Sequence, residues 1–205
     1  MALNGLRLFG VELLGDEEVV PPMPRVSVVT FRELGAVVRR APYRVVDTDD
    51  GELDDYLRVV EAVFQRGTIL PAPFGTVFRS SDQVVHWLEM NHIALAEGLH
   101  FVEGRCEARL HVRRKEHTTD EAAADATALA AESFRTLRRD AAAALPLRQT
   151  TEMPVDLSAA FLVPRAGWEE FAERVAEQAR RSEALEFDLT GPWPPYDFVR
   201  IDFGA

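Results

Sequence analysis

Cysteine is almost absent from this sequence, which has a single one, Cys106, in 205 residues. One cysteine cannot form an internal disulfide bond, so the sequence predicts a fold that needs none and a reducing compartment such as the cytoplasm. Positive charge is also scarce, with 23 Lys and Arg against 34 Asp and Glu and a net charge of −11. That balance argues against binding to nucleic acid or to anionic membrane surfaces, both of which require a basic patch.

Long hydrophobic runs and targeting segments are missing as well. No stretch approaches the ~18 uninterrupted apolar residues of a transmembrane helix, and the first residues lack the basic region and apolar run of a signal peptide. We therefore expect a cytoplasmic protein without membrane insertion. The hydrophobic content of 47% and the aromatic content of 9% are typical of globular proteins. The length is sufficient for one large domain or two small domains, each with its own core.

Motifs for catalysis or cofactor binding are equally lacking. The sequence has no glycine-rich phosphate loop, no dinucleotide fingerprint and no Gly-x-Ser-x-Gly. His86 and His92 are six residues apart, which places them on different faces of a helix and prevents them from sharing a metal ion. Cys106 lies in a predicted strand without an activating neighbour and is expected to be a small buried hydrophobe. We predict no catalytic residue, no metal site and no cofactor.

Strands and helices are predicted along the first half from the apolar spacing. The predicted elements are strands at residues 6–13, 26–31 and 36–39 and helices at residues 52–65 and 80–100. Gly35 is expected in the turn between the second and third strands. Ser80, followed three residues later by Gln83, is a capping-box signature for the start of the second helix.

The second half has strand and helix patterns in the order β-α-β-β-α-β, which is that of the ferredoxin-like unit. The predicted elements are strands at residues 106–113, 147–153, 157–163 and 184–189 and helices at residues 120–144 and 168–181. We predict an α+β fold of two domains. An α+β N-terminal domain covers residues 1–104, and a ferredoxin-like domain covers residues 105–205, with a proline-rich C-terminal tail at 192–205.

Two segments rich in proline and aromatic residues are candidates for tail docking or partner binding. Residues 69–78 are apolar, and their two prolines cannot donate to a β-ladder, so an edge strand or an extended loop is expected. Residues 191–199 carry three prolines in four positions and should form a stiff, polyproline-like rod. Packing against the protein's own core is one interpretation, and contact with a partner is the other. The candidate residues are Pro71, Phe74, Gly75, Phe78, Trp193, Pro194, Pro195, Tyr196 and Phe198.

These two segments are expected to meet. Both are apolar, both are stiffened by proline, and both need cover from water. We therefore predict that Trp193 and Tyr196 dock against the N-terminal domain near Phe74 and Phe78, where each large aromatic would bury on the order of 150–250 Å².

Three motifs together resemble the gas vesicle protein F/L family. They are Pro-Ala-Pro-Phe-Gly-Thr-Val-Phe at 71–78, Ala-Ala-Phe-Leu-Val at 159–163 and Gly-Pro-Trp-Pro-Pro-Tyr-Asp-Phe-Val at 191–199, in the family's order. The last motif is the most specific, because a match with Trp, Tyr and three Pro is unexpected by chance. The resemblance implies an α+β domain followed by a modified ferredoxin-like domain, and no enzymatic activity. It also implies an accessory or minor shell protein of the gas vesicle that binds the main hydrophobic shell protein, with other gas vesicle accessory proteins as further partners.

The chain departs from the family pattern in two places. The link between Val112 and Asp120 is brief, where many relatives carry a longer insertion. The predicted helix at 52–65 lacks a histidine common in relatives and has Tyr56 and Phe64 in that area.

Two classes of function remain open from the sequence. In the first, the chain is a non-enzymatic assembly or minor structural protein of gas vesicles, and a strand of the shell protein adds to the sheet edge at residues 69–78. In the second, the chain is a ferredoxin-like regulatory or ligand-binding module unrelated to vesicle assembly.

Overall fold

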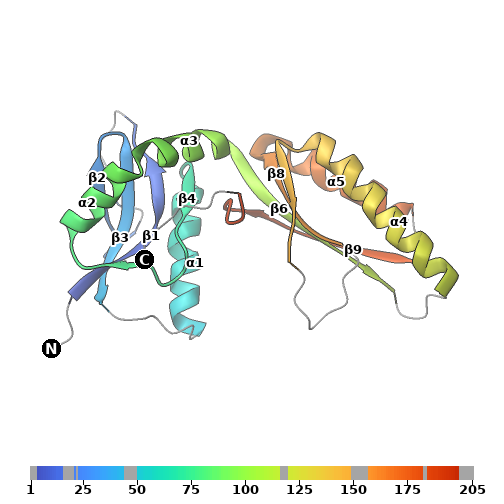
Figure 1. Ribbon diagram of the computed structural model, residues 1–205, viewed down its shortest axis with the longest axis horizontal. Coiled ribbons are helices and arrows are strands. Elements are labelled where there is room, and N and C mark those ends of the chain that lie inside the picture. The colour runs from blue at the N-terminus through green and yellow to red at the C-terminus, as the bar shows by residue number, and fades with distance from the viewer. Residues whose placement is uncertain are drawn as a thin grey trace. The chain divides into compact units, whose positions relative to one another are not determined.

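The computed structural model divides the chain into two compact units. The structure describes residues 4–15, 21, 23–43, 50–115, 120–148, 157–181 and 184–198. Among these, the residues up to 103 and those from 194 on form the first unit, and residues 104–193 form the second. Each unit has one antiparallel sheet with helices packed on it, which is a mixed α+β architecture (Figure 1).

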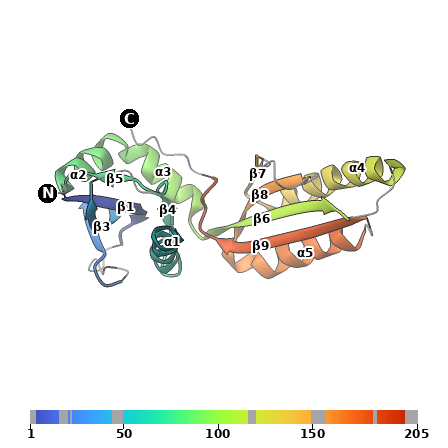
Figure 2. The same cartoon turned by 90° about the horizontal axis from the view of Figure 1, so that it is seen from below.

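The first unit is a sheet covered by helices on both faces. Its elements are β1 (Asn4–Leu13), β2 (Ser27–Phe31), β3 (Leu34–Pro42), α1 (Asp50–Phe64), β4 (Ile69–Pro71), β5 (Val77–Phe78), α2 (Ser81–Met90) and α3 (His92–Val102). The strand order is β2-β3-β1-β4, and β5 also pairs with β1. Helix α1 lies on one face, whereas α2 and α3 lie on the other (Figure 2). Consecutive residues of β3, Val37 and Val38, are both fully buried, as expected for a strand covered on both sides.

The turn between β2 and β3 comes earlier than the glycine suggested. Phe31 pairs with Leu34, so the loop consists of Arg32 and Glu33, and Arg32 has a positive φ of 53°. Gly35 lies inside β3 instead, where an added Cβ would come within 2.7 Å of a leucine side chain. The glycine therefore serves close packing, and its prediction as a turn residue was wrong.

The single helix predicted over residues 80–100 is two helices. Asn91, with φ −108° and ψ 10°, ends α2 and precedes α3, and its side-chain amide donates to the carbonyl of Trp87 at 2.8 Å. Apolar spacing continues through this point, which is why the pattern did not reveal the break. The predicted N-cap is confirmed, because the Ser80 hydroxyl accepts from the backbone N–H of Gln83 at 3.3 Å.

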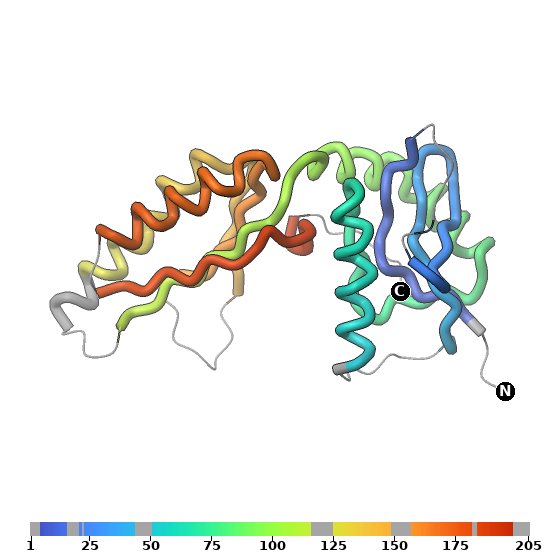
Figure 3. Tube along the Cα trace, turned by 180° about the vertical axis from the view of Figure 1, so that it is seen from behind, coloured from blue at the N-terminus to red at the C-terminus, as the bar shows by residue number. Residues whose placement is uncertain are grey.

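The second unit has a four-stranded sheet in the order β7-β8-β6-β9. Its elements are β6 (Arg105–Arg114), α4 (Asp120–Leu137), a 3₁₀ turn (Arg138–Asp140), β7 (Ala143–Pro146), β8 (Leu157–Pro164), a 3₁₀ turn (Arg165–Gly167), α5 (Trp168–Arg180) and β9 (Leu185–Trp193). The Phe161 ring on β8 lies 5.6 Å from Phe134 of α4 and 5.3 Å from Phe171 of α5. Both helices therefore cover the same face (Figure 1). Figure 3 shows β9, in red, running beside β6.

Helix α4 and the strand that follows it differ from their predicted ranges. The helix ends at Leu137 rather than residue 144, and the next strand is β7 at 143–146 rather than a strand at 147–153. Alanines 143 and 144 pair with Leu162 and Phe161 of β8, so pairing in the sheet overrides the helix propensity of alanine. Residues 149–153 of the predicted strand lie outside the described residues.

The polyproline rod predicted at 191–199 was wrong for its first residues. Strand β9 continues through Gly191 and Pro192 to Trp193, which pairs with Glu107 of β6. Beyond it, the backbone N–H of Tyr196 donates to the carbonyl of Pro194 at 2.8 Å, so the chain forms a turn. The tail residues 199–205 lie outside the described residues.

Candidate functional site

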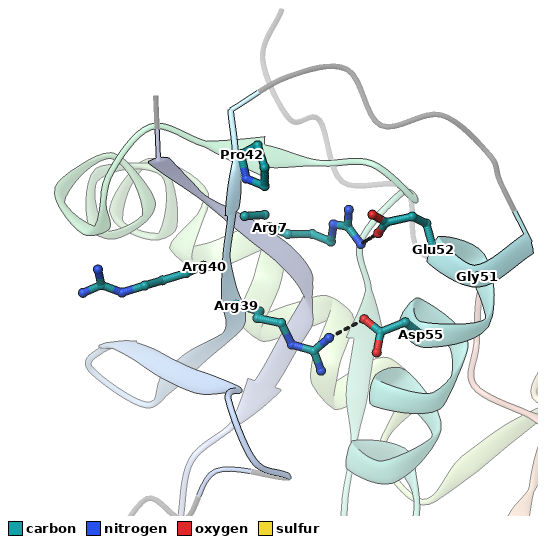
Figure 4. A pocket seen from close by; sticks show the side chains of 8 residues that line it. Arg7, Arg39, Arg40, Pro42, Gly51, Glu52 and Asp55 are labelled. Atoms are coloured by element: carbon teal, nitrogen blue, oxygen red, sulfur yellow. Dashed lines mark hydrogen bonds and ion pairs between the residues drawn. The ribbon is translucent and has the colours of Figure 1, made fainter. Parts of the chain in front are cut away.

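Two ion pairs hold the first turns of α1 on the sheet of the first unit (Figure 4). Arg7 of β1 pairs with Glu52, and Arg39 of β3 pairs with Asp55. These residues line a cleft of about 470 Å³. Only 8% of the Arg7 side chain is exposed, which shields its pair from water and strengthens the attraction. The pairs fix the position of α1, and thereby that of Tyr56 one turn further along.

Tyr56 is a buried side chain of α1 that holds the segment 69–78. It is only 4% exposed, its hydroxyl donates to the carbonyl of Ala72, and its ring lies edge-on to Phe74 at 5.6 Å. Burial raises the pKa of Tyr56, and the proximity of Tyr196 raises it further. The segment 69–78 therefore packs on this side chain of α1, and Tyr196 lies close enough to add to its pKa shift. We call Tyr56, Phe74 and Tyr196 the Tyr56 cluster.

The predicted site residues differ in how much of each side chain water can reach. Phe78 is 6% exposed, and its ring centroid lies 5.5 Å from that of Trp87. Phe78 therefore belongs to the core. Pro194 and Pro195 are buried as well. Trp193 is 43% exposed and lies in the second unit, where its indole N–H donates to the hydroxyl of Thr190 at 3.2 Å. The half-buried members are Pro71, Phe74, Gly75, Tyr196 and Phe198.

Gly75 divides the segment 69–78 into two short strands. Its φ of 85° is one that glycine adopts without strain, and it sits in a turn in which Thr76 N–H donates to the carbonyl of Pro73 at 3.2 Å. The predicted edge position is confirmed for β4, which ends the strand order. Ile69 and Leu70 are fully buried, however, so the side chains of this edge offer little apolar surface.

An exposed apolar corner between α2 and α3 was missed by sequence reasoning. Met90 and Ile93 are both 72% exposed, and with Phe31 and Arg32 they line a cleft of about 480 Å³. The pattern had placed both residues on one continuous amphipathic helix. Asn91, a residue that favours helix ends, was the only local indication of a corner.

A hydrogen-bonded pair of side chains borders this corner. His92 Nε2 lies 2.8 Å from Glu33 Oε1, and the His92 ring meets Phe31 edge-on at 5.8 Å. The pKa of Glu33 is lowered, first by its own backbone N–H and then by His92. The pair joins the β2–β3 turn to the start of α3.

The described residues offer no arrangement suited to metal or thiol chemistry. They contain no group of three or more His, Cys, Asp and Glu side chains that could hold a metal ion. Burial raises the pKa of the Cys106 thiol to about 11, with Arg165 acting in the opposite direction, so the sulfur is protonated at neutral pH. Within the same part of the chain, no helix is long and apolar enough to cross a membrane.

Comparison with known families decides the relationship of the chain. The family described as "Gas vesicle synthesis protein GvpL/GvpF" matches residues 17–144 and 112–200. The chain belongs to this family. The resemblance inferred from the three sequence motifs is thereby confirmed, and all three lie within the matched residues.

Individual members of the GvpL/GvpF family are similar over most of their length. Gas vesicle protein F1 of Halobacterium salinarum is 24% identical over 93% of this chain and 88% of its own. Gas vesicle protein F of Haloferax mediterranei is 26% identical over 88% of this chain and 84% of its own.

Solved GvpF structures share the fold. The crystal structure of gas vesicle protein GvpF from Anabaena sp. PCC7120 matches with a TM-score of 0.81 over 98% of both chains, at 19% identity. That of GvpF from Microcystis aeruginosa matches with a TM-score of 0.75 over 96% of this chain and 99% of its own, at 17% identity. The mixed α+β fold with two antiparallel sheets is therefore that of the GvpF structures.

Proposed function

We propose that this chain is a non-enzymatic assembly factor or minor structural component of gas vesicles that binds the main hydrophobic shell protein. The observation that carries the proposal is the match of the gas vesicle synthesis family from residue 17 to residue 200. That match also favours vesicle assembly over the alternative of a regulatory or ligand-binding module.

The charge of the chain suits this role. A subunit that builds a gas-tight wall needs a large apolar face, and before assembly an exposed apolar face promotes aggregation. An acidic partner can cover that face while its net charge of −11 keeps the complex dispersed. Other gas vesicle accessory proteins are further partners in this proposal, and the cytoplasm and the gas vesicle are the expected locations.

We assign the second unit to the ferredoxin-like class within this proposal. The order of its elements is β6-α4-β7-β8-α5-β9, and its strand order β7-β8-β6-β9 leaves every neighbouring pair antiparallel. Both features support the assignment. The boundary between the two domains is proposed at residues 104 and 105, and of the proposed tail at 192–205 the described residues 194–198 belong to the first unit.

Among the candidate residues, Phe74 is better suited to partner contact than Phe78. Phe74 is half-buried and leaves part of its ring exposed beside Tyr56, whereas Phe78 packs against Trp87 in the core. A charge at Phe78 would therefore unfold the unit before it could test binding.

Co-expression with the shell protein tests the proposal. The chain should increase the amount of shell protein in the supernatant, and Phe74→Asp should reduce that increase. Leu57→Asp is a matched control, because Leu57 on α1 is 42% exposed and its substitution should leave the increase unchanged. Circular dichroism of each variant establishes that it is folded. The assembly role is wrong if the chain neither retains shell protein in the supernatant nor co-purifies with it.

A further inference from the structure

Strand β2 is an open edge of the first sheet. Among the described residues it pairs with β3 alone. Because its two-residue loop makes Phe31 and Leu34 a hydrogen-bonded pair, the alternating antiparallel pattern turns the backbone groups of Val28 and Thr30 away from β3. The strand, Ser-Val-Val-Thr-Phe, carries neither proline nor charge, so it lacks the usual protection of an edge against strand addition.

The side chains of β2 that face α2 and α3 border two separate clefts. At one end, Phe31 lines the cleft of about 480 Å³ with the exposed Met90 and Ile93. At the other end, Ser27 and Val29 line a second cleft of about 350 Å³. Ser27 and Phe31 point to the same face and are four residues apart, which is about 13 Å along a strand.

The two clefts differ in charge. The one beside Phe31 combines the apolar side chains of Phe31, Met90 and Ile93 with charged residues of both signs, Arg32, Glu89 and Glu97. The one beside Ser27 is lined by the arginines Arg40 and Arg79, both exposed. Figure 4 shows that Arg40 points away from the ion pairs of α1, toward the opposite face of the sheet. In a chain of net charge −11, these two arginines give the cleft a local positive charge, which would suit a carboxylate.

We propose that β2 accepts an extended segment of a partner as an additional strand. The segment places an apolar side chain in the cleft beside Phe31 and an acidic side chain, four positions away, in the cleft beside Ser27. Main-chain hydrogen bonds to Val28 and Thr30 supply affinity, and the two clefts supply specificity, as in other cases of strand addition. The inference rests on the proposed function, since the partner is an extended segment of the shell protein.

A second copy of this chain fits the edge less well. In a symmetric pairing of β2 with itself, the arginine cleft would meet a strand without any acidic residue. Arg25 and Arg32 flank that strand, so self-pairing would also bring like charges together.

Hydrogen exchange on the full chain, alone and co-purified with the shell protein, tests the proposal. The amides of Val28 and Thr30 point outward and should exchange rapidly in the free chain. In the complex their exchange should slow by about tenfold or more, the factor that corresponds to one moderately strong hydrogen bond.

A matched pair of variants isolates the backbone contact. Thr30→Pro removes the outward N–H without touching the ladder to β3, as proline is tolerated on an edge, and should weaken binding about tenfold. Thr30→Ala keeps the N–H and should bind as the unchanged chain does. The side-chain contacts are tested by Ile93→Asp and Arg40→Glu, which should each reduce binding, with Leu57→Asp as the control.

Three results would overturn the inference, and they are distinguishable. If the shell protein binds but Thr30→Pro and Ile93→Asp bind it equally well, strand addition at β2 is wrong and the proposed function stands. If the chain forms a dimer that Thr30→Pro abolishes, the occupant is a second copy. If no shell protein binds to the unchanged chain, the proposed function itself fails, and this inference with it.

Discussion

The Tyr56 hydroxyl offers a direct test of how the proline-rich segment 69–78 is held on α1. Tyr56→Phe keeps the ring but leaves the carbonyl of Ala72, a residue 2% exposed, without its donor. Leaving a buried acceptor unpaired costs about 1–3 kcal/mol of unfolding free energy. Tyr56→Ala also removes the ring contacts with Phe9 at 6.1 Å and Phe74 at 5.6 Å, and should cost about 3–5 kcal/mol.

Native-state hydrogen exchange of the β1 amides measures these costs, because it reports the opening of the first unit separately from the second. Tyr43→Phe is the control. Tyr43 is 38% exposed, so its change should stay within about 0.5 kcal/mol. If Tyr56→Phe and Tyr43→Phe were equally stable, the Tyr56 hydroxyl would not be what holds the segment 69–78.

The same substitution has a pH signature. Burial raises the pKa of Tyr56 in the folded state above its ordinary value of 10.0. The contribution of this raised pKa to the free energy of unfolding is fully present below pH 10. Above that pH the unfolded tyrosine ionises while the folded one stays protonated, so stability falls as the pH rises, by up to about 1.4 kcal/mol per pH unit. Tyr56→Phe should remove this part of the alkaline slope, and an unchanged slope would contradict the burial argument.

Two further predictions concern the second unit. Gly191→Ala should lower the unfolding free energy by about 1–3 kcal/mol, because φ is +134° and the added Cβ would lie 2.8 Å from the Trp168 ring. Thermal unfolding measures it against Gly167→Ala, whose Cβ would meet nothing closer than 3.8 Å; equal melting temperatures would refute it. The Cys106 thiol, its pKa raised from 9.0 to about 11, should react with a disulfide reagent at least about a hundredfold more slowly in the native chain than in urea. Equal rates would show that the sulfur is accessible.

The pattern of the second unit could be predicted from the sequence because its strands are locally unambiguous. Phe161 on β8 sits in a continuous apolar run and Leu110 on β6 in an alternating one, and both fall in the same sheet as Phe187 on β9. Its order of strands and helices follows from such runs alone. The bounds of β7 could not be predicted from the local sequence, because alanines 143 and 144 form a strand only through their pairing with β8.

The contacts of the candidate site depend on residues far apart in the chain. Tyr56 reaches Ala72 across 16 residues and lies near Tyr196, which is much further along. No period or motif marks such a meeting point. The aromatic residues in these proline-rich segments indicated that both segments must be shielded from water. They did not indicate which side chain of α1 packs against them. Met90 and Ile93 are exposed because the chain turns at Asn91, and helical spacing contains no such turn.

The two edges of the first sheet explain why the proposed strand addition belongs on β2 and not on the segment 69–78. Edge β4 contains Pro71, which has no N–H to donate, and its neighbours Ile69 and Leu70 direct buried side chains into the core. Proline therefore makes this edge less able to pair with a further strand. Edge β2 has a donor at every position and two clefts beside its side chains. Thr30→Pro would give β2 the property that Pro71 gives β4, so a loss of binding in that variant would show that the difference between the edges decides where a partner strand is accepted.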